Sequence, residues 1–94
     1  MATFEEWLDA YEIFYRTLPT RPELPCPNCG HQTLSMVFTG PPGAGYGYVS
    51  FWCDTCLEGI HLSRAPIPAG VTARSIDAPA ADRRSGIPNY RLVT

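Results

Sequence analysis

All four cysteines of this 94-residue chain fall into two Cys-x-x-Cys pairs, and no other feature limits the fold as strongly. The first pair is Cys26 and Cys29, and the second is Cys53 and Cys56. Each pair forms a short knuckle whose two sulfur atoms can point at one ion. Four thiolates fill a tetrahedral shell, so the spacing predicts one structural Zn²⁺ held by all four cysteines, with no ligand position left for water or substrate.

Two disulfides or an iron centre would use the same cysteines. The N-terminal residues do not resemble a signal peptide, so we expect a cytoplasmic chain in a reducing compartment, where disulfides are disfavoured. A thioredoxin-like redox pair would need a βαβ pattern, which the sequence lacks. Iron stays open as an alternative to zinc, because a rubredoxin-like electron carrier uses the same four thiolates.

Residues 1–18 have the pattern of an amphipathic helix. Thr3 and Glu6 have the spacing of a capping box at its start, and acidic residues in the first turn suit the helix dipole. Large apolar side chains then recur every three or four residues and form one stripe. The stripe consists of Phe4, Trp7, Leu8, Tyr11, Phe14, Tyr15 and Leu18. Pro19 is expected to end the helix.

The aromatic stripe has two interpretations. It can pack on the rest of the same chain, as the apolar face of most helices does. It can instead dock on a protein partner or a second copy, because a thin two-knuckle domain offers little apolar surface while each large aromatic side chain buries about 150–250 Å². In the second interpretation the partner surface consists of Trp7, Tyr11, Phe14 and Tyr15, joined by Tyr46 from a glycine-rich loop.

Three prolines make residues 19–25 a stiff, extended linker, which is expected to hold the helix at a distance from the metal site. Strand-like sequence follows at residues 32–39, 48–52 and 60–63, and its side chains favour extended backbone. Residues 40–47 contain four glycines and two prolines, so they form a loop. The three segments predict a small antiparallel sheet.

Residues 65–94 show no sustained periodicity, so we expect an irregular segment. A short helix is predicted at residues 78–85, with Asp77 as its N-cap and Gly86 as its terminator. Residues 87–93 contain enough apolar side chains to dock as an extended segment.

Over residues 24–64 the sequence resembles a zinc ribbon. The resemblance rests on the knuckle Cys26-Pro27-Asn28-Cys29-Gly30, a hairpin, the knuckle Cys53-Asp54-Thr55-Cys56 followed by Gly59, and a closing strand. A glycine after a knuckle permits the left-handed turn that aims backbone amides at sulfur. Zinc ribbons serve transcription machinery, ribosomal proteins, enzymes and adaptors, so the resemblance implies a fold and a metal rather than one function.

The remaining polar residues do not assemble into a catalytic group. His31 and His61 lie close to the knuckles, but four cysteines already complete the shell, so both are expected outside it. Asp54 and Glu58 are expected to be solvated. Because no nucleophile, base and orienting group can be identified, the sequence predicts no enzyme.

A nucleic-acid-binding or transcription-associated ribbon is the main alternative function. Tyr46 and Tyr48, with Phe51 and Trp52 nearby, offer a stacking platform for single-stranded nucleic acid. Residues 26–62 contain no Lys or Arg, however, and a four-thiolate zinc site itself carries a charge of about −2. Phosphate backbones require the opposite sign, so nucleic acid is not the favoured partner.

The sequence therefore predicts a small α+β, zinc-stabilised domain. An N-terminal amphipathic helix (residues 1–18) and a proline-rich linker (19–25) precede a three-stranded antiparallel zinc ribbon (26–64) and an irregular C-terminal segment (65–94). No apolar run reaches the length of a membrane span. We expect a non-enzymatic adaptor or accessory subunit that binds a protein partner.

Overall fold

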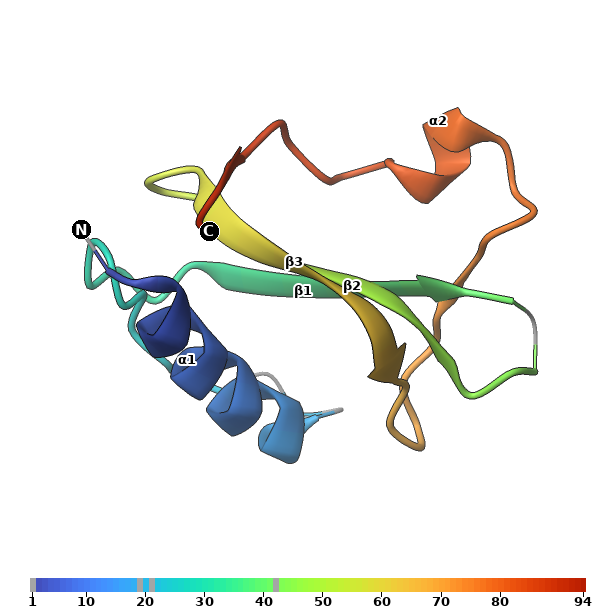
Figure 1. The fold of residues 1–94 in the computed structure, drawn as a ribbon, viewed down its shortest axis with the longest axis horizontal. Coiled ribbons are helices and arrows are strands. Elements are labelled where there is room, and N and C mark those ends of the chain that lie inside the picture. The colour runs from blue at the N-terminus through green and yellow to red at the C-terminus, as the bar shows by residue number, and fades with distance from the viewer. Residues whose placement is uncertain (1, 19, 21, 42) are drawn as a thin grey trace.

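A computed structural model describes residues 2–18, 20, 22–41 and 43–94 of the chain. The elements are α1 (Phe4–Thr17), β1 (Leu34–Gly40), β2 (Tyr46–Cys53), β3 (Glu58–Pro66), β4 (Arg74–Ser75), α2 (Ala80–Arg83) and β5 (Arg91–Leu92), as Figure 1 shows. Pro19 and Arg21 of the predicted linker, and Pro42 of the predicted loop, lie outside the described residues. Neither described helix is both long enough and apolar enough to cross a membrane.

The sheet is mixed and contains five strands in the order β4-β1-β2-β3-β5. The predicted antiparallel meander of β1, β2 and β3 is present. The prediction of a purely antiparallel ribbon with an irregular tail is wrong, because β4 pairs in parallel with β1 and β5 pairs in parallel with β3. The C-terminal segment thereby supplies hydrogen-bond partners to both edges of a thin sheet, whose free backbone groups would otherwise need water.

Local sequence explains where α1 begins and ends. The Thr3 hydroxyl accepts a hydrogen bond from the Glu6 amide, and the Glu6 carboxylate accepts one from the Thr3 amide, so the predicted capping box is present. At the other end, Leu18 leaves the helical conformation before the proline at position 19.

The aromatic stripe of α1 packs on one face of the sheet, around the ring of Phe51. Ring centroids of Trp7, Tyr11 and Phe14 lie 5.7, 6.1 and 5.4 Å from that of Phe51, all in edge-to-face geometry. Trp7 and Phe51 are fully buried, and Phe14 is 4% exposed. Packing within the chain, the first of the two interpretations of the stripe, is therefore what the structure contains.

The start of α1 lies beside the first knuckle, where the Ala2 amide donates a hydrogen bond of 3.0 Å to Asn28 Oδ1. The expectation that the linker holds the helix away from the cysteines is therefore wrong. A helix of 14 residues is about 21 Å long, and the seven residues between Leu18 and Cys26 can span about the same distance when extended. The linker is thus long enough to return the chain along the helix to its starting end.

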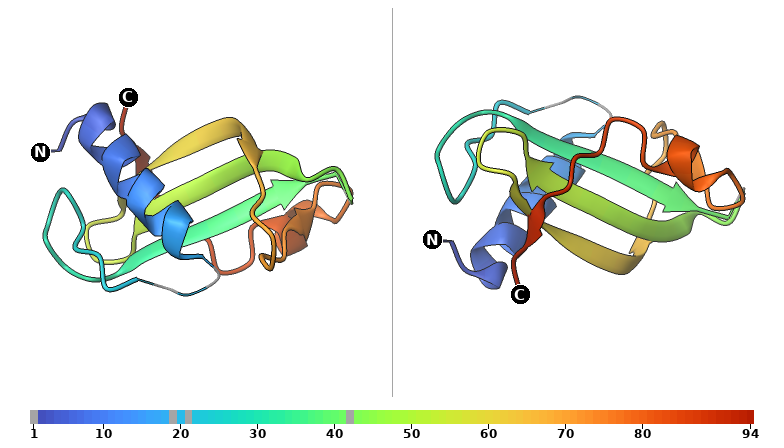
Figure 2. Two further views of the ribbon diagram at one scale, coloured as in Figure 1. Left: turned by 90° about the horizontal axis from the view of Figure 1, so that it is seen from below. Right: turned by 90° about the horizontal axis from the view of Figure 1, so that it is seen from above.

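The opposite face of the sheet is crossed by residues 76–90, which we call the strap (Figure 2). The crossing follows from the topology, since β4 and β5 lie at opposite edges and the strap joins them. The short helix α2 in the strap is shorter than the predicted 78–85, and Pro79 rather than Asp77 occupies its N-cap. Gly86 follows α2 with a φ of +78°, which fits its predicted role as terminator.

Candidate metal centre

The four cysteines converge at the end of the sheet where β2 delivers Cys53. Their four Sγ atoms all lie within 4.8 Å of one another. Cys26 and Cys53 are buried, whereas Cys29 and Cys56 are half-buried. The structure therefore brings together all four residues that the sequence predicted as metal ligands, from two segments more than twenty residues apart in the sequence.

The sulfur separations fit a shared metal better than disulfides. Cys26 Sγ lies 3.8 Å from Cys56 Sγ, and Cys29 Sγ lies 3.5 Å from Cys53 Sγ. A disulfide requires about 2.05 Å. In a tetrahedral site with metal–sulfur bonds of about 2.3 Å, the sulfur atoms lie about 3.8 Å apart. The four thiols and their spacing therefore suit an ion that binds four thiolates, such as Zn²⁺.

The first knuckle is closed by its own backbone. The Gly30 amide donates to the Cys26 carbonyl at 2.9 Å, and the Cys26 amide donates to the His31 carbonyl at 2.8 Å. Gly30 has a φ of +80°, the left-handed conformation expected of the glycine after this knuckle. The turn leaves the Asn28 amide 3.3 Å from Cys26 Sγ, where it donates to the sulfur.

In the second knuckle the left-handed residue is Leu57, with a φ of +54°, rather than Gly59. The Leu57 amide closes the turn on the Cys53 carbonyl at 2.9 Å, as Gly30 does in the first knuckle. Gly59 has another role. A Cβ atom there would lie 2.2 Å from the Phe51 carbonyl oxygen and 2.8 Å from Trp52 Cβ, so the close approach of β3 to β2 requires a glycine.

Burial raises the pKa values of the thiols, and hydrogen-bond donors close to the sulfur atoms lower them. Burial raises the pKa of Cys26 to about 12 and also raises the pKa of Cys56. Cys53 is buried too, yet hydrogen bonds from the Thr33 hydroxyl and from backbone amides of residues 55 and 56 lower its pKa to about 6. A divalent cation would offset the remaining cost, because it binds thiolates directly.

Asp54 fastens the second knuckle to the sheet. Its carboxylate accepts a hydrogen bond from the Ser35 hydroxyl and one from the indole nitrogen of Trp52, both at 2.8 Å. Its amide donates to the Thr33 carbonyl at 2.9 Å. Glu58, at the start of β3, is 8% exposed. Asp54 is exposed, as expected, although its carboxylate is hydrogen-bonded, whereas the expectation that Glu58 is solvated is wrong.

The two histidines lie outside the sulfur cluster, as expected. His31 is exposed, and its backbone carbonyl serves the first knuckle. His61 lies on β3 with its ring 5.2 Å from that of Tyr48, on the face of the sheet that the strap crosses. The cluster therefore consists of sulfur donors alone, which leaves no ligand position free in a tetrahedral shell.

The residues predicted for a partner surface do not form one patch. Trp7 and Phe14 are buried against Phe51, so they are not available to a partner. Tyr11 and Tyr15 are half-buried and line a hollow of about 240 Å³ between α1 and the end of β3. Tyr46 is 53% exposed at the start of β2.

The proposed aromatic platform for nucleic acid is also not free. Phe51 is buried beneath α1, and Trp52 is 2% exposed because Tyr90 of the strap stacks on it, with centroids 5.7 Å apart and an interplanar angle of 12°. Tyr46 and Tyr48 remain at least partly exposed. Two of the four rings are therefore structural.

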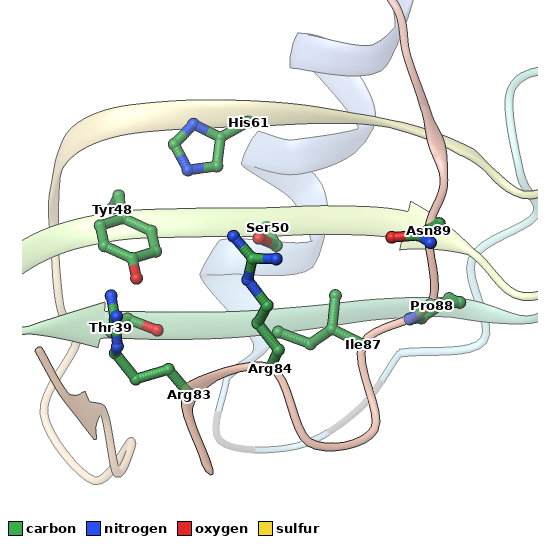
Figure 3. Close-up of a pocket in the computed structure, with 9 residues that line it drawn as sticks. All are labelled: Thr39, Tyr48, Ser50, His61, Arg83, Arg84, Ile87, Pro88 and Asn89. Carbon is green, nitrogen blue, oxygen red and sulfur yellow. The ribbon is translucent and has the colours of Figure 1, made fainter. Parts of the chain in front are cut away.

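Sequence reasoning missed a polar pocket of about 300 Å³ between the sheet and the strap (Figure 3). Its floor contains Thr39, Tyr48, Ser50 and His61 from β1, β2 and β3. These positions alternate with core positions along each strand, so the strand pattern places them on one face. No local sequence pattern predicts that the strap covers that face.

Comparison of the chain with models of known protein families, with curated proteins and with solved structures gives no significant match.

Proposed function

We propose that Cys26, Cys29, Cys53 and Cys56 bind one Zn²⁺ that stabilises the fold, and that the chain is a non-enzymatic module that binds a protein partner. The observation that carries the proposal is the convergence of four sulfur atoms within 4.8 Å. Four thiolates complete a tetrahedral shell, so the ion has a structural role and no open position for a substrate. Zinc is preferred to iron because paired Cys-x-x-Cys knuckles are the usual ligands of structural zinc.

The hollow between α1 and the end of β3 has the chemistry of a surface that binds a protein partner. Tyr11, Tyr15 and Pro66 provide its apolar and aromatic surface, and Glu12 and Arg16 provide charges of both signs. The Tyr15 hydroxyl donates to the Pro66 carbonyl at 3.0 Å, which fixes one wall. Tyrosine and arginine are enriched at protein interfaces, where a rigid ring offers contact area at little entropic cost.

Charge favours protein over nucleic acid for this module. The chain has a formal net charge of −2, and a four-thiolate zinc centre would add negative charge where residues 26–62 contain no Lys or Arg. A phosphate backbone binds chiefly through Lys and Arg, so the knuckles do not offer a suitable surface.

The metal is tested by X-ray absorption of the purified chain. We expect a zinc edge and a shell of four sulfur atoms at about 2.3 Å. An iron edge with red visible absorbance would instead favour the electron-carrier alternative.

The partner surface is tested by site-specific photo-crosslinking in the native host. A crosslinker at Ile13, which is 50% exposed on α1, is expected to capture one partner. Exchanging the charges of the hollow with Glu12→Lys and Arg16→Glu should abolish that crosslink, because both side chains are exposed and line the hollow. Glu23→Lys, an exposed control in the linker, should leave it intact. A crosslink that persists in the double variant would refute this surface.

A further inference from the structure

The pocket between the sheet and the strap has walls of different chemistry. Hydroxyl groups of Thr39, Tyr48 and Ser50 lie on the sheet side. Thr39 is 1% exposed and Ser50 is 8% exposed, so these polar residues are buried beneath the strap rather than displayed at the surface. Ser50 and His61 are direct partners across β2 and β3, which places the imidazole beside the hydroxyl on the same face.

Two arginines form the opposite wall. The side chains of Arg83 and Arg84 reach from the strap over β1 and β2 (Figure 3). Among the described residues no Asp or Glu lines the pocket, although Asp77 and Asp82 belong to the same strap. Among the residues that the structure describes, neither arginine forms an ion pair. Their charges therefore face a chamber that contains hydrogen-bond donors and no compensating acid.

Hydrogen bonds fix the backbone turn that carries the two arginines and the side chain of Arg83. Arg83 Nε donates to the Ala78 carbonyl at 3.0 Å, which fixes the direction of that side chain. Arg74 Nη1 donates to the carbonyls of Asp82 and Arg83, at 3.3 and 3.0 Å, and so secures the end of α2. The Arg84 amide closes the helical turn on the Ala80 carbonyl at 3.1 Å. The strap therefore presents the two guanidinium groups from a fixed turn.

We propose that this pocket binds the phosphate group of a small phosphate monoester. Guanidinium groups pair with phosphate oxygens through charge-assisted hydrogen bonds that are stronger than neutral ones. Hydroxyls on the sheet and arginines on the strap offer donors from opposite sides, which suits a tetrahedral phosphoryl group better than a planar carboxylate. The inference goes beyond the proposed protein-binding module and does not depend on it.

The volume of the pocket limits the size of the phosphate monoester that can bind. A volume of about 300 Å³ lies at the lower end of small-molecule sites, enough for a phosphate group and a small organic part. Ile87 and Pro88 of the strap and the ring of Tyr48 supply apolar surface for that part. A nucleic-acid strand would instead need cations along an open groove, whereas these charges are gathered at one chamber.

Titration of the ¹⁵N-labelled, metal-bound chain with phenyl phosphate tests the proposal. We expect saturable binding, with resonance shifts centred on β2 and the strap. Arg84→Gln should weaken the affinity about tenfold or more, because it removes one charged hydrogen-bond donor. Tyr48→Phe is a second variant that removes a single hydroxyl and should weaken binding by a smaller factor. Arg83 is left unchanged because its Nε also supports Ala78.

Arg64→Gln is the matched control, since it removes an exposed arginine of β3 that is not among the residues lining the pocket. Phenyl phosphate affinity should stay the same in this variant. Benzoate, a carboxylate with the same ring, should bind more weakly than phenyl phosphate. The proposal is overturned if binding of phenyl phosphate does not saturate, if Arg64→Gln weakens the affinity as much as Arg84→Gln, or if benzoate binds equally well. Tighter binding of a short oligothymidylate through the same residues would also overturn it and would indicate a nucleic-acid ligand.

Discussion

Thr33 shows that the metal centre depends on side chains outside the two knuckles. Its hydroxyl lies 3.2 Å from Cys53 Sγ and 2.6 Å from the hydroxyl of Thr55. The Thr33 carbonyl accepts a hydrogen bond from the Asp54 amide. Thr33, which lies directly before β1, therefore contacts the second knuckle through both its side chain and its backbone. Such supporting hydrogen bonds orient a ligand and stabilise its charged form.

Thr33→Val should therefore weaken metal binding, although valine keeps nearly the same side-chain shape as threonine. Loss of the hydroxyl removes a donor to the Cys53 thiolate, and supporting hydrogen bonds of this kind are worth about 10–100-fold in metal affinity. Competition with a chromophoric chelator measures the change. Thr72→Val, at an exposed position far along the chain, is the control and should match the parent. Equal affinities for all three proteins would show that the Thr33 hydroxyl does not support the site.

Tyr11 should make the fold sensitive to alkali. The pKa of Tyr11 is raised from its ordinary value of 10.0 to about 12, mainly by burial and to a smaller extent by the nearby Tyr15. Above about pH 10 the unfolded chain loses this proton while the folded chain retains it, so the free energy of unfolding falls as pH rises toward 12. Below pH 10 both states hold the proton, and Tyr11 contributes no pH dependence.

Unfolding by urea between pH 9 and pH 12 checks this expectation, because the alkaline loss of stability should be smaller in Tyr11→Phe. Tyr46→Phe removes an exposed hydroxyl at the hairpin and should behave as the parent does. If Tyr11→Phe has the same alkaline slope as the parent, Tyr11 does not titrate in this way.

The helix α1 shows which structural features the sequence could predict. Its bounds follow from the capping box and the proline, both local signals, and its stripe follows from spacing. The surface that the stripe meets could not be predicted, because a docking helix and a packed helix have the same amphipathic pattern. The stripe packs on the sheet because Phe51 and Phe38 provide a complementary face. These contacts join residues that are distant in the sequence.

Trp7 offers the sharpest test of that packing. Trp7→Ala should destabilise the chain by about 3–5 kcal/mol, because the side chain is fully buried against Phe51. Trp7→Phe should cost far less. The indole Nε1 is buried and has no hydrogen-bond partner among the described residues, and relief of such a group recovers about 1–3 kcal/mol.

Chemical denaturation of both variants, with Ile13→Ala as an exposed control on the same helix, measures these costs. The control should stay within about 0.5 kcal/mol of the parent. If Trp7→Ala proves as mild as the control, the stripe does not pack on the sheet in solution.

For the chain as a whole, the path of the strap across the sheet could not be predicted, although residues 87–93 were expected to dock as an extended segment and β5 does pair with β3 there. The pairings that attach it, β4 to β1 and β5 to β3, involve two residues on each short strand and leave no periodic pattern. The cysteine cluster, by contrast, could be predicted residue by residue, because the ligand chemistry requires a fixed spacing within each knuckle. The polar pocket lies between a predictable strand face and the unpredicted strap, so it was missed.

Tyr90 anchors the end of the strap and allows its contribution to be measured. The ring stacks on Trp52, and the hydroxyl donates to the Ile60 carbonyl at 3.3 Å. Tyr90→Ala should cost about 1–3 kcal/mol, the sum of one aromatic pair and one hydrogen bond. Hydrogen exchange should also rise at the Arg91 and Val93 amides, which donate to the Leu57 and Gly59 carbonyls. Asn89→Ala, at the exposed neighbouring position, should leave both quantities unchanged.

The claim that one ion held by the four cysteines stabilises the whole fold is tested by thermal unfolding with and without that ion. The purified chain should contain one equivalent of zinc, and removal of the metal by a chelator should lower the unfolding temperature sharply until zinc is added back. Cys29→Ser should reproduce the chelated state in the presence of zinc. Clearly less than one equivalent of metal, or a cooperative transition that the chelator does not shift, would contradict the claim.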